Sequence, residues 1–303
     1  MPALPRLTPR QRALLGDRFP GAELVGDHSW GLIGTTVLRL RHAGRDLAVK
    51  AGDDADTHIA RELRAHREWT GPLRGSAPEL VYADADAKLL VTGWLPGELV
   101  QGRPAEQEPG TYRQAGALLA RLHGQAGTVD DGYEARMRDR ALRQLDTPHR
   151  IAPDTEARLR AEIATWPDGP ATLVPTHGDW QPRNWLVHHG TVTVIDFGRA
   201  DLRPAHTDLC RLAVQQFRDR PELERAFLDG YGDDPRTGSA WRRELLREAI
   251  GTAVWAHRVG DERFERQGHR MVAEALDPPV SRPRPADPRP EDGPRPSSAR
   301  CSR

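Results

Sequence analysis

The stretch THGDWQPRNWLVHHGTVTVIDFGRA, residues 176–200, decides the fold. It contains two short apolar runs, at 186–187 and 191–195, which predict two strands. The sequence His-His-Gly at 188–190 fits a tight turn between them. In an antiparallel hairpin closed by this turn, residues whose numbers sum to about 379 face one another. This register determines which side chains meet at the open end of the hairpin.

Three oxygen-bearing side chains are expected at that open end. The numbers of Asn184 and Asp196 sum to 380, so these residues lie side by side, and Asp179 is in the loop just before the first strand. Carboxylate and amide oxygens suit Mg2+, which takes only a few protein ligands and keeps waters beside substrate phosphates. Asn184 is also the only asparagine in the chain. The hairpin therefore predicts a magnesium site.

The order of these motifs resembles the aminoglycoside phosphotransferase family, which has the protein-kinase-like fold. The resemblance rests on His-Gly-Asp at 177–179, on Asn184 and on Ile-Asp-Phe-Gly at 195–198. It implies that Asp179 orients the attacking hydroxyl group and accepts its proton, while Asn184 and Asp196 bind the metal that holds the nucleotide phosphates. It also implies ATP and Mg2+ as cofactors.

Each of these motifs also has a structural interpretation on its own. His-Gly-Asp is a plausible turn, and Asp-Phe-Gly is a strand that ends in glycine. Their order, the hairpin register and the position of the single asparagine together favour the functional interpretation. Gln181 and Arg183 depart from the His-Pro-Gly commonly found in this loop of the family, and this difference concerns the substrate side.

The nucleotide side is expected upstream. Lys50 ends the apolar run 47–50, where the resemblance places a phosphate-binding lysine, and it is one of only two lysines in the chain. A helix at about 56–69 supplies the expected partner, because Glu62 falls beside its apolar stripe whereas Glu68 falls opposite. The structural alternatives are an exposed strand end for Lys50 and a solvated helix charge for Glu62.

Two further segments are expected to contact the nucleotide. The loop at 26–34, between the first two strands, would cover phosphates with its backbone amides. It does not match G-x-G-x-x-G, and its glycines also suit a simple hairpin turn. The link at 92–94 would contact the adenine edge with its backbone, as the resemblance implies. The residues expected in these two segments are Ser29, Gly31, Gly34, Thr92 and Trp94.

The whole pattern predicts an α+β, bilobal protein-kinase-like fold. Residues 1–93 form a small antiparallel-sheet lobe that binds nucleotide, and residues 94–276 form a mainly helical catalytic and acceptor-binding lobe. Residues 277–303 form a disordered tail rich in proline and arginine. Helices are expected at about 9–18, 56–69, 111–123, 154–166, 206–218, 221–230, 239–257 and 261–276.

The composition limits the classes of partner and the cellular compartment that we expect for this protein. The 303 residues include 44 basic and 44 acidic side chains, and this zero formal charge argues against a nucleic-acid binder. No apolar run approaches the ~20 residues of a membrane-spanning helix, and the N-terminal prolines and arginines do not resemble a signal peptide. Two cysteines cannot form a disulfide framework, which suits a reducing cytoplasm. A cytoplasmic enzyme without membrane or protein partners is therefore expected.

The acceptor is expected to be a small molecule with a hydroxyl group. The chain reaches its next helix at about His206, soon after Gly198, which leaves too little room for the activation segment of a protein kinase. The expected enzyme is an Mg-ATP-dependent phosphotransferase, with an aminoglycoside-type antibiotic as one acceptor. Acidic residues at 130–134, 233–234 and 261–265 would attract such a polyamine or form solvated faces.

Three alternatives remain open from the sequence. A metabolic kinase for a sugar, a choline-like or an amino-alcohol acceptor would use the same machinery. A non-catalytic nucleotide-binding module would keep the fold, although the complete set of lysine, aspartates and asparagine argues against it. A metal-dependent phosphohydrolase would use the same carboxylates with His177, His188 and His189, whose spacing on a turn is unfavourable.

Overall fold

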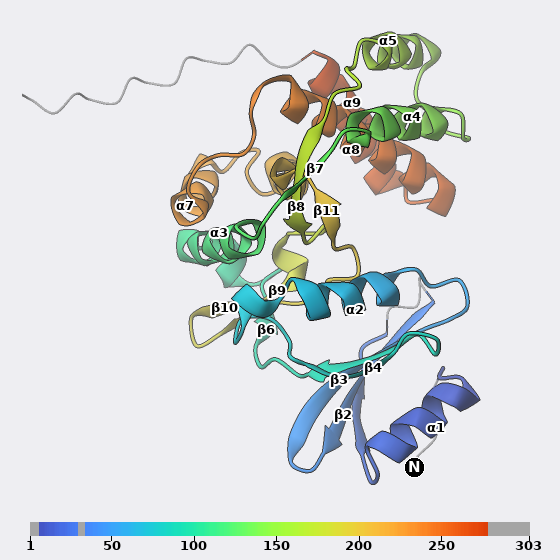
Figure 1. The fold of residues 1–303 in the computed structure, drawn as a ribbon. Coiled ribbons are helices and arrows are strands. Elements are labelled where there is room, and N and C mark those ends of the chain that lie inside the picture. The colour runs from blue at the N-terminus through green and yellow to red at the C-terminus, as the bar shows by residue number, and fades with distance from the viewer. Residues whose placement is uncertain (1–5, 30–33, 278–303) are drawn as a thin grey trace, which may run out of the picture.

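A five-stranded antiparallel sheet forms the first lobe in the computed structural model, which describes residues 6–29 and 34–277 (Figure 1). The strand order is β1-β2-β3-β5-β4. The strands are β1 (Glu23–Asp27), β2 (Thr35–His42), β3 (Arg45–Gly52), β4 (Leu80–Asp84) and β5 (Leu89–Gly93). The small antiparallel sheet expected in this part of the sequence is therefore confirmed.

Two helices cover this sheet, α1 (Pro9–Arg18) on one face and α2 (His58–Glu68) on the other (Figure 1). Burial alternates along β2 and β3, so the buried leucines and valine of these strands pack on the α1 side. On the opposite face, Ile59 of α2 packs with Leu90 of β5. Glu62 is also buried on α2, so this helix carries a charged group toward the sheet.

Helices dominate the second lobe, which also contains two small antiparallel sheets (Figure 1). In this lobe α3 packs on α7, and α8 packs on α9. The helices are α3 (Pro109–His123), α4 (Tyr133–Leu145), α5 (Pro153–Ala164), α6 (Cys210–Val214), α7 (Pro221–Tyr231), α8 (Gly238–Val259) and α9 (Glu262–Leu276). The sheets, with orders β10-β9-β6 and β11-β8-β7, comprise β6 (Glu98–Leu99), β7 (Thr128–Asp130), β8 (Ala171–Thr176), β9 (Trp185–His188), β10 (Thr191–Val194) and β11 (Asp201–Arg203).

The hairpin of β9 and β10 has the predicted register. Thr191 faces His188, and the numbers 191 and 188 sum to 379. Beyond the last paired residues, the N–H of Ile195 donates to the carbonyl oxygen of Asn184 at 3.0 Å. This hydrogen bond extends the pairing to the predicted metal position and brings the open end of the hairpin together.

Two helical segments differ from the expectation. The segment 206–218 is a 3₁₀ turn (Ala205–Leu209) followed by the short α6, because Asp208 in the turn is held by the loop that precedes β9. Helix α4 was not predicted, because its apolar residues are sparse among arginines and its buried first turn is stabilised by α8. The strands β6, β7 and β11, each two or three residues long, were also missed.

The described part of the chain is therefore α+β, with a small antiparallel-sheet lobe and a mainly helical lobe. The lobe boundaries at residues 93 and 276 stay predictions. The tail beyond Asp277 and the expected nucleotide contact at Gly31 lie outside the described residues. Within residues 6–29 and 34–277, no helix combines the length and apolar character that crossing a membrane requires.

Candidate active site

The loop from His177 to Asn184 connects β8 to β9 and contains the predicted catalytic residue. Gly178 in this loop has a φ of +78°, and a Cβ atom there would be 2.2 Å from the carbonyl oxygen of Arg199. Only glycine combines this backbone conformation with so close an approach. The segment after Asp-Phe-Gly therefore packs directly against the loop.

Asp208 fixes this loop through its buried carboxylate. It accepts hydrogen bonds from the backbone N–H groups of His177, at 2.8 Å, and Gly178, at 2.6 Å, and contacts Nε2 of His123 at 3.0 Å. Burial would raise the pKa of Asp208, but the hydrogen bond with His123 and nearby charges outweigh it and lower the pKa. Nε2 of His177 contacts the carbonyl oxygen of Ile195 at 3.0 Å. The loop is thus tied to both the hairpin and α3.

Both carboxylate oxygens of Asp179 are occupied by donors from the protein itself. Oδ2 accepts from Nη2 of Arg183 at 2.6 Å and from Nδ2 of Asn184 at 2.9 Å. Oδ1 accepts from the side chains of Gln181 and Arg211. The Asp179 side chain is only 4% exposed. Asp179 is therefore a buried anion that four side chains hold in one orientation.

Guanidinium groups dominate the charge around Asp179. Arg211, on α6, also donates from Nε to Glu248 of α8 at 3.0 Å, and Arg199 interacts electrostatically with the same charges. Burial would raise the pKa of Asp179, but Arg211 and Arg183 outweigh it and hold the pKa well below its usual range. Asp179 is therefore ionised, which is the state that orients a hydroxyl group.

Asn184 and Asp196 are neighbours at the open end of the hairpin. Nδ2 of Asn184 also donates to the carbonyl oxygen of Asp179 at 2.8 Å, so Oδ1 of the same amide faces away from this contact. Asp196 has a φ of +67°, and its Oδ1 is 2.8 Å from Nζ of Lys50. The second oxygen of Asp196 and the amide oxygen of Asn184 are hard donors. The two residues therefore fit the magnesium ion that the sequence predicts.

The ammonium group of Lys50 contacts carboxylates from both lobes. Its Nζ is 2.8 Å from both carboxylate oxygens of Glu62 and 2.8 Å from Oδ1 of Asp196. Burial would lower the pKa of Lys50, but the carboxylates of Asp196 and Glu62 outweigh it and raise the pKa. The ammonium of Lys50 in turn lowers the pKa of Asp196. The lysine, the helix glutamate and one predicted metal ligand thus meet at one point.

The loop after β1 is closed by its own hydrogen bonds. The hydroxyl oxygen of Ser29 accepts from the N–H of Val37 at 3.0 Å. The carbonyl oxygen of Gly34 accepts from the N–H of Asp53 at 3.1 Å. One end of the loop is therefore attached to β2 and the other to the residue that follows β3, while Gly31 lies outside the described residues.

The link between the lobes begins where β5 ends. Thr92 is buried and pairs with β3, and the N–H of Trp94 donates to the carbonyl oxygen of Asp46 at 3.0 Å. The Trp94 ring lies 5.0 Å from the ring of His28 and 4.7 Å from the guanidinium carbon of Arg39. The N–H of Trp94 is therefore engaged in the sheet, and its side chain lies beside the start of the loop after β1.

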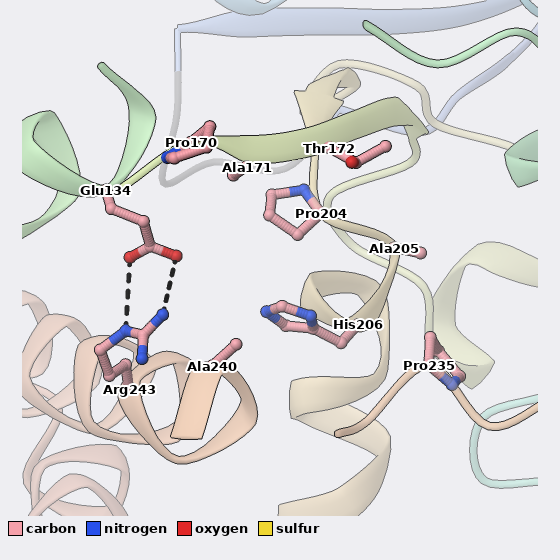
Figure 2. Close-up of a pocket in the computed structure, with 10 residues that line it drawn as sticks. All are labelled: Glu134, Pro170, Ala171, Thr172, Pro204, Ala205, His206, Pro235, Ala240 and Arg243. Carbon is pink, nitrogen blue, oxygen red and sulfur yellow. Dashed lines mark hydrogen bonds and ion pairs between the residues drawn. The ribbon is translucent and has the colours of Figure 1, made fainter. Parts of the chain in front are cut away.

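A cavity of about 260 Å³ in the second lobe lies beside one of the acidic groups (Figure 2). Figure 2 shows Glu134 in direct contact with Arg243 at one side of it, with His206 nearby. The carboxylate of Glu134 accepts from Arg243 at 3.1 Å and from Arg247 at 3.1 Å. No residue of the loop 177–184 lines this cavity. Glu134 therefore forms a buried ion pair away from the loop 177–184.

Other members of the acidic groups are also paired with basic side chains. The pairs are Asp130 with Arg136, Asp234 with Arg236, Glu262 with Arg266, and Glu265 with Arg150. Among the described residues, Asp131, Asp233 and Asp261 of the same groups have no basic partner, and Asp261 instead accepts a hydrogen bond from the N–H of Phe264. The acidic groups are therefore mostly, but not wholly, paired within the protein.

The sequence interpretation missed Arg199, Arg211 and Glu248 at this site. Arg183, which departs from the His-Pro-Gly common in the family, was the one sequence signal of additional positive charge near the loop 177–184. Arg211 and Glu248 lie on α6 and α8, and only the tertiary structure brings them to Asp179. No local motif could have identified them.

A model of the phosphotransferase enzyme family matches residues 25–245, which is more than half of the chain. No curated protein sequence matches the chain.

Solved structures with a similar fold cover nearly the whole chain. A thermostable mutant of aminoglycoside phosphotransferase APH(4)-Ia, in a ternary complex with ADP and hygromycin B, has a TM-score of 0.65 and 14% identity, covering 89% of this chain and 98% of that one. Macrolide 2'-phosphotransferase MphH from Brachybacterium faecium has a TM-score of 0.57 and 19% identity, with coverages of 89% and 98%. Choline kinase LicA from Streptococcus pneumoniae has a TM-score of 0.63 and 13% identity, with coverages of 88% and 96%. These likenesses show a bilobal, protein-kinase-like fold.

Proposed function

The chain belongs to the phosphotransferase enzyme family, and we propose that it transfers the γ-phosphate of Mg-ATP to a hydroxyl group of a small molecule. The observation that carries this proposal is the meeting of Lys50, Glu62 and Asp196 beside the hydrogen-bonded pair of Asp179 and Asn184. Phosphoryl transfer depends on positioning and charge neutralisation more than on a covalent nucleophile. This arrangement is suited to both tasks.

On the nucleotide side, Lys50 would contact phosphate oxygens while Glu62 keeps its Nζ in place. Asn184 and Asp196 would hold Mg2+, which neutralises phosphate charge when bound. We also propose nucleotide contacts in the loop after β1 and in the link between the lobes. The residues proposed for these contacts are Ser29, Gly31, Gly34, Thr92 and Trp94.

On the acceptor side, Asp179 would accept a hydrogen bond from the hydroxyl group and then its proton. Asn184 fixes Oδ2 of Asp179 through Nδ2, and the backbone of the loop is anchored by Asp208. Because the pKa of Asp179 is lowered, this residue acts mainly by orienting the hydroxyl group rather than as a strong base.

We propose two classes of acceptor on the strength of the similar structures. Those structures include a complex with ADP and hygromycin B, a macrolide 2'-phosphotransferase and a choline kinase. An aminoglycoside-type antibiotic and a metabolic alcohol of the choline, amino-alcohol or sugar type are therefore both candidates. The compartment we propose is the cytoplasm, where ATP is available.

The phosphohydrolase alternative fits the histidines poorly. Nε2 of His177 is engaged by the carbonyl oxygen of Ile195, and the rings of His188 and His189 lie 4.1 Å apart on the hairpin turn. These three side chains have separate structural contacts, which does not favour a shared metal centre.

The test is a panel of hydroxylated small molecules assayed for ADP formation with Mg-ATP. The panel contains hygromycin B, a macrolide, choline, ethanolamine, sugars and sugar acids. We expect ADP formation that requires both Mg2+ and one acceptor class, and that stops when EDTA removes the metal. ADP formation at the same rate with and without every acceptor would contradict the proposal, because it would indicate an ATP hydrolase.

A further inference from the structure

We propose that the acceptor carries an anionic group, a carboxylate or a phosphate, beside the hydroxyl group that receives the phosphoryl group. This inference rests on the proposed function, because it concerns the acceptor of the same site. Within the proposed classes it favours an acidic or phosphorylated sugar or alcohol over an aminoglycoside or choline. It follows from the side chains that surround Asp179 and from the charges they leave unbalanced.

The first observation is that Asp179 has no free carboxylate oxygen for an incoming hydroxyl group. Oδ1 is taken by Gln181 and Arg211, and Oδ2 by Arg183 and Asn184. An acceptor hydroxyl can reach Asp179 only if one of these donors moves away. The acceptor must therefore compensate the donor that it displaces.

Arg183 is the donor best placed to move. Its side chain is 35% exposed, and Asp179 is the hydrogen-bond partner of its guanidinium group among the described residues. Arg211 is instead anchored by Glu248, and Asn184 also donates to the backbone of the loop. A carboxylate or phosphate on the acceptor would replace Asp179 as the partner of the Arg183 guanidinium group and form a bidentate, charge-assisted contact with it. Asp179 would then be free for the hydroxyl group.

A neutral or cationic acceptor offers no such replacement. It would leave the Arg183 guanidinium group, whose side chain is 35% exposed, to water in place of a carboxylate, and the site would lose a charge-assisted hydrogen bond. A polycation would also be repelled by the arginines that face Asp179. The loop position occupied by Arg183 is one where the chain departs from the family's usual His-Pro-Gly, so the charge is a feature of this sequence.

The second observation is an arginine without a carboxylate partner. The guanidinium group of Arg199 forms no hydrogen bond or ion pair with any residue in 6–29 or 34–277. Arg199 is solvent-exposed, and the guanidinium group of Arg211 adds a second positive charge nearby. Around Asp179 the described residues thus place three guanidinium groups against the carboxylates of Asp179 and Glu248, while the nearby Asp196 is paired with Lys50.

The position of this cluster favours the acceptor over the nucleotide. The point where Lys50 meets Glu62 and Asp196 marks the nucleotide side. Arg211 instead comes from α6 and is held by α8, in the helical lobe where the acceptor is expected. Glu134, the buried member of the acidic group at 130–134, is already paired with Arg243 (Figure 2) and does not compensate this positive charge.

Matched acceptor pairs test the inference directly. Glycerate and gluconate carry the carboxylate arm, glycerol 3-phosphate and glucose 6-phosphate carry the phosphate arm, and glycerol and glucose are their neutral partners. Hygromycin B and choline represent cations. We expect kcat/KM for ADP formation to be about 10- to 100-fold higher for the anionic member of at least one pair, the size expected of hydrogen bonds to charged groups. The arm that shows this preference identifies the anion.

Two arginine variants locate the effect, and a third variant is the control. Arg183→Gln and Arg199→Gln should each raise KM for the anionic acceptor about tenfold or more while KM for ATP stays nearly constant. Arg263→Gln, at an exposed position on α9, removes the same charge and should change neither constant. Equal losses of kcat with anionic and neutral acceptors, at unchanged acceptor KM, would overturn the inference, because the arginines would then serve the transferred phosphate.

The failure of this inference can be told apart from the failure of the proposed function. Efficient turnover of hygromycin B, choline or the neutral partners, with no anionic preference, would overturn the inference and keep the phosphotransferase. If no acceptor is turned over, calorimetry on protein loaded with Mg2+ and AMP-PNP decides. Binding of an anionic probe that is lost in Arg183→Gln would support the inference, whereas equal or absent binding of all probes would overturn it.

Discussion

Asp179 faces more positive than negative charge, and this determines its expected pH behaviour. Arg211 and Arg183 outweigh the effect of burial and lower its pKa, so the ionised form is present at every pH above that lowered value. We expect no acidic limb from Asp179 in kcat/KM between about pH 5 and pH 8. The measurement is the pH–rate profile of the protein and of Asp179→Asn. An acidic limb in this range that vanishes in the variant would contradict the assignment.

The same residue should matter far more for turnover than for nucleotide binding. In Asp179→Asn the hydroxyl group of the acceptor loses its anionic partner, so we expect kcat to fall on the order of 10²-fold or more. Nucleotide affinity should stay nearly constant, because Asp179 is on the acceptor side. Asp219→Asn removes one exposed carboxylate and is the control. A variant with near-normal kcat would remove Asp179 from the proposed role.

The two lysines of the chain provide a matched comparison. Lys50 contacts Glu62 and Asp196, whereas Nζ of Lys88 donates to the carbonyl oxygens of Asp54, at 2.6 Å, and Asp56, at 2.9 Å. We expect Lys50→Met to weaken ATP use at least about tenfold in kcat/KM. Lys88→Met should instead lower the unfolding free energy by about 1–2 kcal/mol with normal kinetics. Steady-state kinetics and denaturant titration distinguish these results, and equal kinetic losses would contradict the assignment of Lys50.

At the scale of elements, α3 and α7 approach so closely that one position requires glycine. A Cβ atom at Gly116 would be 2.1 Å from the carbonyl oxygen of Phe227, whereas at Gly110, on the same helix, it would meet nothing within 4 Å. Gly116→Ala should therefore separate the helices and lower the unfolding free energy by about 1–3 kcal/mol. Gly110→Ala should cause no loss. Denaturant titration of both variants checks this, and equal stability would contradict the packing.

Elements whose pattern is local were predictable, and those stabilised by distant partners were not. The hairpin register of β9 and β10 follows from a tight turn and alternating residues, and it extends to the hydrogen bond between Ile195 and Asn184, next to Asp196. Helix α4 depends on Glu134, whose ion pairs with α8 are invisible in the local sequence. The short 3₁₀ turn around Asp208 is likewise stabilised by hydrogen bonds from a loop 30 or more residues away.

At the scale of the molecule, the candidate active site lies where the two lobes meet. Lys50 of the sheet lobe contacts Asp196 of the helical lobe, and His58 of α2 contacts the carbonyl oxygen of Gly198 at 3.0 Å. Motif order in the sequence was enough to predict this meeting, because each motif occupies a fixed place in the fold. The charge around Asp179 was not predictable, because it is assembled from the loop, α6 and α8.

The central claim is that this arrangement moves a phosphoryl group from ATP to a hydroxyl group. The most direct measurement follows the label from ATP carrying ³²P in the γ position, with Mg2+ and the acceptor panel. The account predicts that the label appears in a phosphate monoester of one acceptor, in amounts equal to the ADP formed. Label recovered only as inorganic phosphate, or retained in ATP with every acceptor, would contradict it.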